Sequence, residues 1–298
     1  MEVLKLKTIG VLTSGGDAPG MNAAIRAVVR SGCESGMRVM GIRRGYKGLI
    51  EGDMFEMNLR SVSDIIHRGG TMLYSARCPE FSESDVQDKA VEVCKEFGLD
   101  GIVTIGGDGT FKGARALTLK GVPCIGIPGT IDNDISSCDY TIGYDTALNT
   151  VMDMVDRIRD TTESHDRCSI VEVMGRNAGY LALNAGIAVG ATCILIPEID
   201  YDIDSYIIER MKRTQKTGVE SRATILGHVQ RGGSPSVRDR VLASQMGFYA
   251  VQLLKEDVGN RVVVVKNDKI VDYDIIEALN MKKSIDPELY RIANEISI

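Results

Sequence analysis

The segment TIGVLTSGGDAPGMN, residues 8–22, decides the fold. Its first six residues are mostly β-branched or aliphatic, which predicts a buried strand over Thr8–Thr13. A glycine-rich turn follows, and the next amphipathic stretch predicts a helix over Met21–Glu34. Glycines in such a turn let backbone N–H groups approach an anion, and the helix N-terminus adds a favourable dipole. A tight strand-to-helix turn that needs glycine explains the segment equally well.

The same alternation of short apolar runs and amphipathic stretches continues along the chain, which predicts an α/β protein with parallel strands. Further strands are expected at Arg38–Ile42, Gly101–Ile105, Cys124–Ile127, Ser169–Val173, Cys193–Ile196, Ala223–Leu226 and Val262–Val265. Further helices are expected at Asp85–Phe97, Phe111–Lys120, Ala147–Arg159, Ala178–Val189, Asp204–Lys212 and Arg238–Lys255. A domain boundary is expected near Gly143, with the chain crossing back near Gln230.

Composition excludes several classes of protein. The chain has 298 residues, 44% of them hydrophobic and 26% charged, which is ordinary for a globular protein. A net charge of -6 argues against a broad nucleic-acid surface, and 5% aromatic residues argue against single-strand stacking platforms. The seven cysteines form no CxxC pair, so reduced thiols in a cytosol are expected rather than a zinc site or disulfide framework.

No membrane or export segment is expected. The first residues run directly into the strand at Thr8, which leaves no room for the apolar part of a signal peptide. The uncharged run from Asn177 to Pro197 is interrupted by Gly179, Gly186 and Gly190, so a buried helix followed by a strand fits it better than a membrane span.

A second glycine-rich loop, Gly106-Gly107-Asp108-Gly109-Thr110, also follows a predicted strand and opens a predicted helix. Asp108 is suited to hold Mg²⁺ that bridges nucleotide phosphates, because Mg²⁺ combines one or two carboxylates with waters and phosphate oxygens. GGDGT loops occur in sugar, lipid and NAD kinases. The loop therefore indicates a phosphoryl donor but does not select the acceptor.

A third loop, Pro128-Gly129-Thr130-Ile131-Asp132-Asn133-Asp134, follows the strand at Cys124–Ile127. Phosphoryl transfer to a hydroxyl needs a base, and Asp132 is the expected one. An Asx-rich turn would be the first interpretation of this loop alone. Position favours the base, because all three loops end strands at one edge of the inferred sheet, where α/β proteins bind ligands.

Basic residues surround two later strands. Arg167 and Arg176 flank the strand at Ser169, Arg222 precedes the strand at Ala223, and His228 and Arg231 follow it. Arginine matches phosphate oxygens bidentately, so this group predicts an anionic substrate. A solvated charged face explains any single arginine, and for Arg222 spacing alone leaves that alternative open.

Together, TSGGDAPGMN, GGDGT, PGTIDND, VEVMGR and GHVQRGGSP resemble the ATP-dependent 6-phosphofructokinases of the bacterial type, in order and along nearly the whole chain. The resemblance implies transfer of the γ-phosphoryl group of MgATP to the 1-hydroxyl of fructose 6-phosphate in a cytoplasmic homotetramer. It also implies two doubly wound α/β domains with mostly parallel sheets. We expect an ATP-binding domain at 1–143 plus 230–280 and a fructose 6-phosphate domain at 144–229 plus 281–298.

The family motifs imply a role for each matching residue. ATP contacts are expected from Gly16, Arg77, Gly107, Asp108, Gly109 and Thr110, with Mg²⁺ on Asp108. Asp132 would be the base, assisted by Thr130, Arg176 and Arg77. Sugar phosphate contacts are expected from Thr130, Asp132, Asp134, Arg167, Met174, Gly175, Arg176, Arg222, His228 and Arg231. Arg167 and Arg222 resemble the pair that reaches into a neighbouring subunit's active site.

Regulation and donor choice follow from the same resemblance. Arg26, Arg30 and Arg159 match the family's site for ADP or phosphoenolpyruvate, but Asp53 stands where an effector-binding arginine is usual, which predicts altered or absent effector control. Pyrophosphate-dependent members carry Asp and Lys at the positions of Gly109 and Gly129, so glycine at both favours ATP.

The stretch between Glu198 and Arg222 departs from the family, because it is roughly two dozen residues too short for the expected helix, strand and helix. Either residues of the molecule are missing from this stretch, or the chain is a truncated relative that lacks a strand-containing segment, and no residue replaces the segment's substrate-binding Glu by motif. The alternative function is therefore a non-catalytic or impaired nucleotide-binding relative. A lipid or NAD kinase would leave PGTIDND and HVQRGGSP unexplained.

Overall fold

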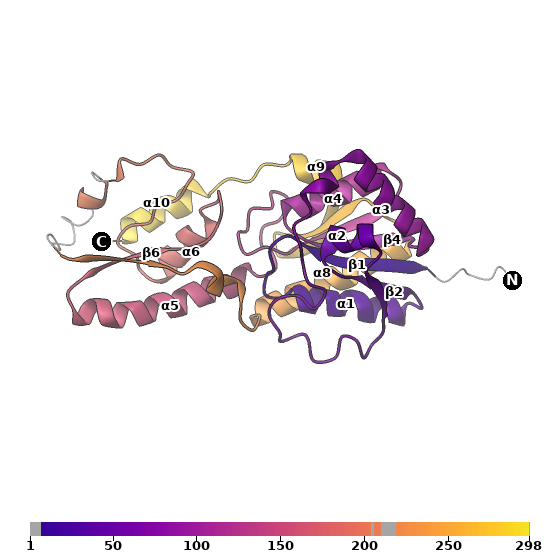
Figure 1. The fold of residues 1–298 in the computed structure, drawn as a ribbon. Coiled ribbons are helices and arrows are strands. Elements are labelled where there is room, and N and C mark those ends of the chain that lie inside the picture. The colour runs from indigo at the N-terminus through magenta and orange to yellow at the C-terminus, as the bar shows by residue number, and fades with distance from the viewer. Residues whose placement is uncertain (1–6, 204–205, 210–218, 298) are drawn as a thin grey trace.

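The computed structural model describes residues 7–203, 206–209 and 219–297, which form two lobes joined by several crossings of the chain (Figure 1). The larger lobe is built on a seven-stranded sheet in the order β3-β2-β1-β4-β5-β8-β9. Its strands are β1 (Thr8–Ser14), β2 (Arg38–Ile42), β3 (Met54–Met57), β4 (Gly101–Gly106), β5 (Cys124–Pro128), β8 (Arg261–Lys266) and β9 (Lys269–Asp274). The pairs among β2, β1, β4, β5 and β8 are parallel, and the edge strands β3 and β9 pair antiparallel.

Helices cover both faces of this sheet. They are α1 (Met21–Glu34), α2 (Gly45–Glu51), α3 (Ser84–Glu96), α4 (Asp108–Leu119), α8 (Val237–Lys255) and α9 (Ile275–Asn280), together with the short 3-10 helix η1 (Pro79–Ser82). Their apolar faces explain the packing, because α1 alternates buried residues such as Ile25 and Val28 with the more exposed Arg26 and Arg30.

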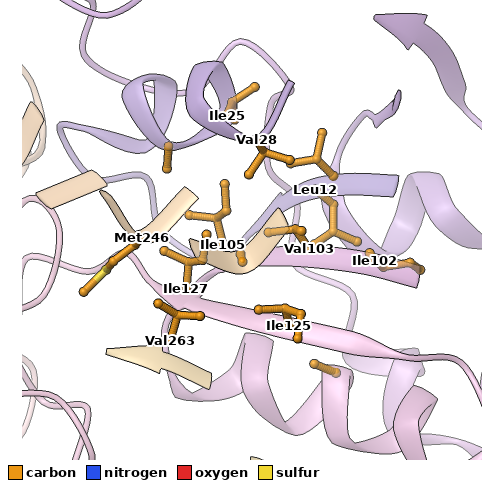
Figure 2. Close-up of a cluster of buried hydrophobic side chains, with 14 of the residues drawn as sticks. Leu12, Ile25, Val28, Ile102, Val103, Ile105, Ile125, Ile127, Met246 and Val263 are labelled. Carbon is orange, nitrogen blue, oxygen red and sulfur yellow. The ribbon is translucent and has the colours of Figure 1, made fainter. Parts of the chain in front are cut away.

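The core lies between the central strands and the helices packed on them. Every residue of β1, β4 and β5 is buried, as expected for parallel strands covered on both faces. Figure 2 shows strand side chains such as Val103 and Ile127 meeting Ile25 of α1 and Met246 of α8, all of them buried. This rigid layer fixes the positions of the loops that leave the strands.

The topology contains a switch point between β1 and β4. The chain leaves β1 toward β2 on one side, whereas β4 lies on the other side of β1. Loops that leave neighbouring strands in opposite directions open a crevice at the carboxyl edge of the sheet. The loops after β1, β4 and β5 all lie at this edge, as the sequence predicts.

The smaller lobe has a parallel pair of strands, β6 (Cys168–Glu172) and β7 (Ser221–Ile225), with α5 (Tyr144–Ser164), α6 (Tyr180–Ala188), α10 (Pro287–Ile296) and the 3-10 helix η2 (Gly227–Arg231). This pair is far more exposed than the large sheet, with Ile170 of β6 50% and Ile225 of β7 69% exposed. A separate small apolar cluster contains Leu183, Ile194, Ile196 and Ala293.

The predicted strand at Cys193–Ile196 is wrong, because these residues are irregular in the structure. Ile194 and Ile196 are buried against Leu183 and Ala293, but a strand also needs a neighbouring strand for its backbone groups. The part of the chain that the structure describes pairs β6 only with β7. Most of the predicted helix Asp204–Lys212 and of the polar stretch 212–221 lies outside the described residues.

None of the helices in the described ranges combines the length and apolar character that crossing a membrane requires.

Candidate active site

Three loops meet at the switch point. The hydroxyl of Thr110, in the first turn of α4, donates to the carbonyl of Ser14 at 3.0 Å and so joins the loops after β4 and β1. The backbone N–H of Gly129 donates to the carbonyl of Gly106 at 3.0 Å and joins the loops after β5 and β4. The structure therefore brings together the three motifs that the sequence predicts to meet.

Asp132 lies in the third of these loops and is 8% exposed. Its backbone N–H donates to Thr130 Oγ1 at 3.2 Å, and Thr130 in turn is fixed through its own carbonyl by the Thr141 hydroxyl at 2.6 Å. Oδ1 of Asp132 is buried without a hydrogen-bond partner. A buried carboxylate oxygen without a donor is costly, which is a common feature of reactive groups rather than of structural ones.

The electrostatic surroundings of Asp132 are mixed. Burial raises the pKa of the Asp132 carboxyl and neighbouring Asp134 raises it further, while Arg231 and Arg176 lower it. The net result is a raised pKa, which strengthens the carboxylate as a proton acceptor. Burial also raises the pKa of Asp134, against the opposing effect of Arg176.

Asp108 begins α4, directly after Gly107, and its Oδ2 lies 2.7 Å from Nζ of Lys112 one turn later. The position thus already accommodates a cation beside a helix N-terminus. The described residues contain no cluster of three or more potential metal-ligating side chains. One carboxylate nevertheless fits Mg²⁺ that completes its coordination with water and nucleotide phosphate oxygens.

Arg231 lies against the first loop. Its Nη1 donates to the carbonyl of Asp17 at 3.0 Å, and a Cβ atom at Gly16 would lie 2.5 Å from the same nitrogen. Glycine at position 16 therefore permits the guanidinium to approach the loop. The structure brings this arginine to the loop after β1 as well as near Asp132, which the sequence does not predict.

The turn that carries Arg176 is connected to the turn that carries Arg231. The backbone N–H of Met174 donates to Oε1 of Gln230 at 3.1 Å, and Nε2 of Gln230 donates to the carbonyl of Gly227 at 2.9 Å. Gln230 is completely buried. Gln230 was not predicted as a site residue, although its place inside the HVQRGG motif is a usable signal.

Arg167 and Arg222 lie together but at the opposite end of β6 and β7 from Arg176 and His228. Nε of Arg167 donates to Oε2 of Glu220 at 2.9 Å, and Arg222 pairs with the other oxygen of the same carboxylate. The hydrogen bond from Arg167 and the charges of both arginines lower the pKa of Glu220. Glu220 is a second residue that the sequence does not reveal.

The remaining predicted residues are spread over the chain. Arg77 is exposed in the loop before η1, and His228 is exposed in η2.

The residues of the predicted effector site are divided between the lobes. Arg26 and Arg30 lie on α1 of the larger lobe, whereas Arg159 lies on α5 of the smaller lobe and donates to the carbonyl of Val189. Asp53 forms ion pairs with Arg43 at 3.1 Å and Arg44 at 2.6 Å.

Comparisons with known proteins agree with this geometry. The family model described as phosphofructokinase matches residues 8–218 and 206–254. The chain belongs to the phosphofructokinase family. The curated "ATP-dependent 6-phosphofructokinase" of Bacillus cytotoxicus is 53% identical over 98% of this chain and 100% of its own length, and that of Halalkalibacterium halodurans is 54% identical over the same shares.

A solved structure confirms the family's fold. The phosphofructokinase of Saccharomyces cerevisiae superposes with a TM-score of 0.85 and 32% identity, covering 98% of this chain and 48% of the yeast chain. This agrees with the predicted α/β class.

The comparisons also agree with the predicted shortening. The alignment with the Bacillus protein spans 320 positions, whereas this chain has 298 residues. The family model matches in two pieces that overlap at residues 206–218, within the stretch between Glu198 and Arg222. Nothing in the comparisons favours the non-catalytic alternative.

Proposed function

We propose that the chain transfers the γ-phosphoryl group of MgATP to the 1-hydroxyl of fructose 6-phosphate, giving fructose 1,6-bisphosphate and ADP in glycolysis. The observation that carries the proposal is the unpartnered Oδ1 of Asp132, buried where three loops meet at the switch point. The names of the relatives support the choice of donor and acceptor.

In this proposal Asp132 accepts the proton of the 1-hydroxyl as it attacks the phosphoryl group. Gly16, Gly107, Gly109 and Thr110 bind the nucleotide, and a Cβ atom at Gly109 would meet nothing within 4 Å, so this part of the loop is open. Arg176 and Arg77 stabilise the charge of the transferring group. Mg²⁺ held by Asp108 would neutralise phosphate charge when bound.

The sugar phosphate is assigned to Thr130, Asp134, Met174, Gly175, His228 and Arg231, together with Arg167 and Arg222 of a neighbouring subunit. Arg167 and Arg222 lie at the opposite end of β6 and β7 from Arg176 and His228. This location supports a role for the two arginines in the active site of a neighbouring subunit. We therefore propose a cytoplasmic homotetramer with shared active sites. Its two domains would be 1–143 plus 230–280 and 144–229 plus 281–298.

We also propose that effector control is altered or absent. Arg26, Arg30 and Arg159 remain the proposed contacts for ADP or phosphoenolpyruvate. Asp53 brings a negative charge, and its pairing with Arg43 and Arg44 neutralises part of the local positive charge. A sigmoidal response to fructose 6-phosphate that ADP relieves would contradict this part of the proposal.

The direct test is ADP release by the purified chain with MgATP, measured with and without fructose 6-phosphate and with identification of the bisphosphate product. Release that depends on fructose 6-phosphate is expected. ATP binding without such release would overturn the proposal.

The pH dependence of kcat should depend on Arg231. Its positive charge lowers the pKa of Asp132, so Arg231→Gln should raise that pKa. Since the base acts only above its pKa, the acid limb of kcat should move to higher pH. The measurement is kcat at saturating fructose 6-phosphate from pH 5 to 8, with exposed Arg115→Gln on α4 as the matched control. An acid limb that stays in place would contradict the role of Arg231.

A further inference from the structure

Lys283 occupies the segment in which the chain crosses from α9 of the larger lobe to α10 of the smaller lobe (Figure 1). Its side chain does not extend into solvent. Nζ donates to the carbonyl of Asn133 at 2.7 Å and to the carbonyl of Cys138 at 2.8 Å. One ammonium group thus joins the two ends of a turn, and these ends lie 150 and 145 residues before Lys283 in the sequence.

The turn held in this way is the one that follows Asp132. Asn133 adopts a left-handed backbone conformation with φ of 52°, which is uncommon for a residue other than glycine. Its side chain is fixed on both sides, because Nδ2 donates to the carbonyl of Asp139 at 3.1 Å and Oδ1 accepts from the N–H of Thr141 at 3.1 Å. Lys283 binds main-chain carbonyls at both ends of the same turn.

Lys283 also contacts the smaller lobe. Its Nζ lies 4.6 Å from the centre of the ring of Tyr180, the first residue of α6, in a cation–π arrangement. The carbonyl of Tyr180 accepts from the hydroxyl of Tyr144 at 2.9 Å, which fixes the start of α6 against the start of α5. The ammonium therefore lies where the catalytic turn, the crossing segment and α6 meet.

We propose that Lys283 is a positioning residue that sets the turn carrying Asp132 and Asp134 against α6 and thereby aligns the base with the sugar substrate. This inference deepens the proposed kinase function and rests on it. Lys283 itself touches no reacting group. Its effect should therefore appear in kcat, whereas the nucleotide loop at Gly107–Thr110 and ATP binding should be little affected.

The position also makes the interaction sensitive to pH. Burial lowers the pKa of Lys283 to about 8. As the pH rises through this value the ammonium loses its charge, and hydrogen bonds from a neutral amine are weaker than charge-assisted ones. The turn should therefore be held less firmly above pH 8.

The neighbouring groups do not titrate in the same range. The charged or titratable groups that face Lys283 are Asp134, Asp139, Lys266, Cys138 and Tyr180. Burial raises the pKa of Cys138 to about 11 and that of Tyr180 to about 12, and the hydrogen bond to Asp139 raises the pKa of Lys266. Burial raises the pKa of Asp134. Hydrogen bonds from Lys266 and Asn267 lower the pKa of Asp139, although its partial burial opposes them.

The test compares Lys283→Met, Lys283→Arg and the matched control Lys282→Met, which changes the exposed neighbour on the same segment. For each, kcat and the KM values for ATP and fructose 6-phosphate are measured from pH 6 to 10. The unaltered chain and Lys282→Met should lose kcat as the pH rises through about 8. Lys283→Met should lower kcat at pH 7 roughly 10- to 100-fold, the order expected for a misplaced catalytic group, with little change in KM for ATP.

Lys283→Arg should keep a larger part of kcat than Lys283→Met and should lack the alkaline limb, because a guanidinium stays charged across this range. A merely structural lysine would leave the pH profile of Lys283→Arg like that of the unaltered chain, and that result would overturn the assignment. If Lys283→Met fails to fold, the profile of Lys283→Arg still decides. An unaltered chain without fructose 6-phosphate-dependent turnover would overturn the proposed function and this inference with it, whereas an active chain with unchanged Lys283 variants overturns the inference alone.

Discussion

Replacing Asp132 by Asn should reduce kcat by a factor of about 10²–10⁴, the range expected for loss of a general base. The amide keeps the size of the carboxyl group, so the loop should keep the hydrogen bond from the Asp132 N–H to Thr130 Oγ1. What disappears is the proton acceptor at the unpartnered Oδ1. ATP binding should persist, because the loops after β1 and β4 are unchanged.

The measurement is single-turnover and steady-state phosphoryl transfer at saturating substrates, with ATP affinity measured separately by calorimetry. Asp153→Asn is the matched control, since Asp153 undergoes the same chemical change but lies exposed on α5, where it pairs with Arg157. Turnover of Asp132→Asn near that of the control would remove Asp132 from the role of base. A loss of ATP binding would show instead that the substitution disturbed the nucleotide loop.

The parts of the fold that the sequence predicts well are those with local causes. The predicted ranges of α1 and β2 agree with those in the structure. A glycine-rich turn marks the start of α1 at Met21, and β2 is a short run of mostly apolar residues from Arg38 to Ile42. The edge strand β9 was not predicted, since its residues Lys269–Asp274 alternate without a strongly apolar face. The strand forms because it pairs with β8, and this pairing cannot be predicted from the local sequence.

The candidate site divides in the same way. The placement of Asp108 and Asp132 at the carboxyl edge of the sheet was predictable, because each lies in a short motif that directly follows an apolar strand. Glu220 and Lys283 were not predicted, because both depend on partners far away in the sequence. Glu220 joins Arg222, two residues after it, to Arg167, 53 residues before it, and Lys283 binds Asn133, 150 residues before it. The strand expected at Cys193–Ile196 does not form, and no strand of the described residues pairs with this stretch.

A second large effect is expected from Asp239, which is completely buried in the first turn of α8 and caps a different helix. Its Oδ1 accepts from the N–H of Gly143 at 2.8 Å, and its Oδ2 accepts from the N–H of Thr146 at 2.8 Å and from the Thr146 hydroxyl at 2.5 Å. These groups begin α5, where the helix dipole favours a negative charge. Asp239→Ala would leave the donors buried and unpaired.

We expect Asp239→Ala to lower the free energy of unfolding by roughly 2–4 kcal/mol, because each buried donor left without a partner costs about 1–3 kcal/mol. The comparison is urea unfolding against Asp274→Ala, the same substitution at a helix cap whose carboxylate accepts from the N–H groups of Ile276 and Glu277 but is more exposed. That control should lose about 1 kcal/mol, as expected for an accessible cap. Equal losses in the two variants would mean that water replaces the carboxylate of Asp239, and that α5 does not depend on this residue for its start at the boundary between the lobes.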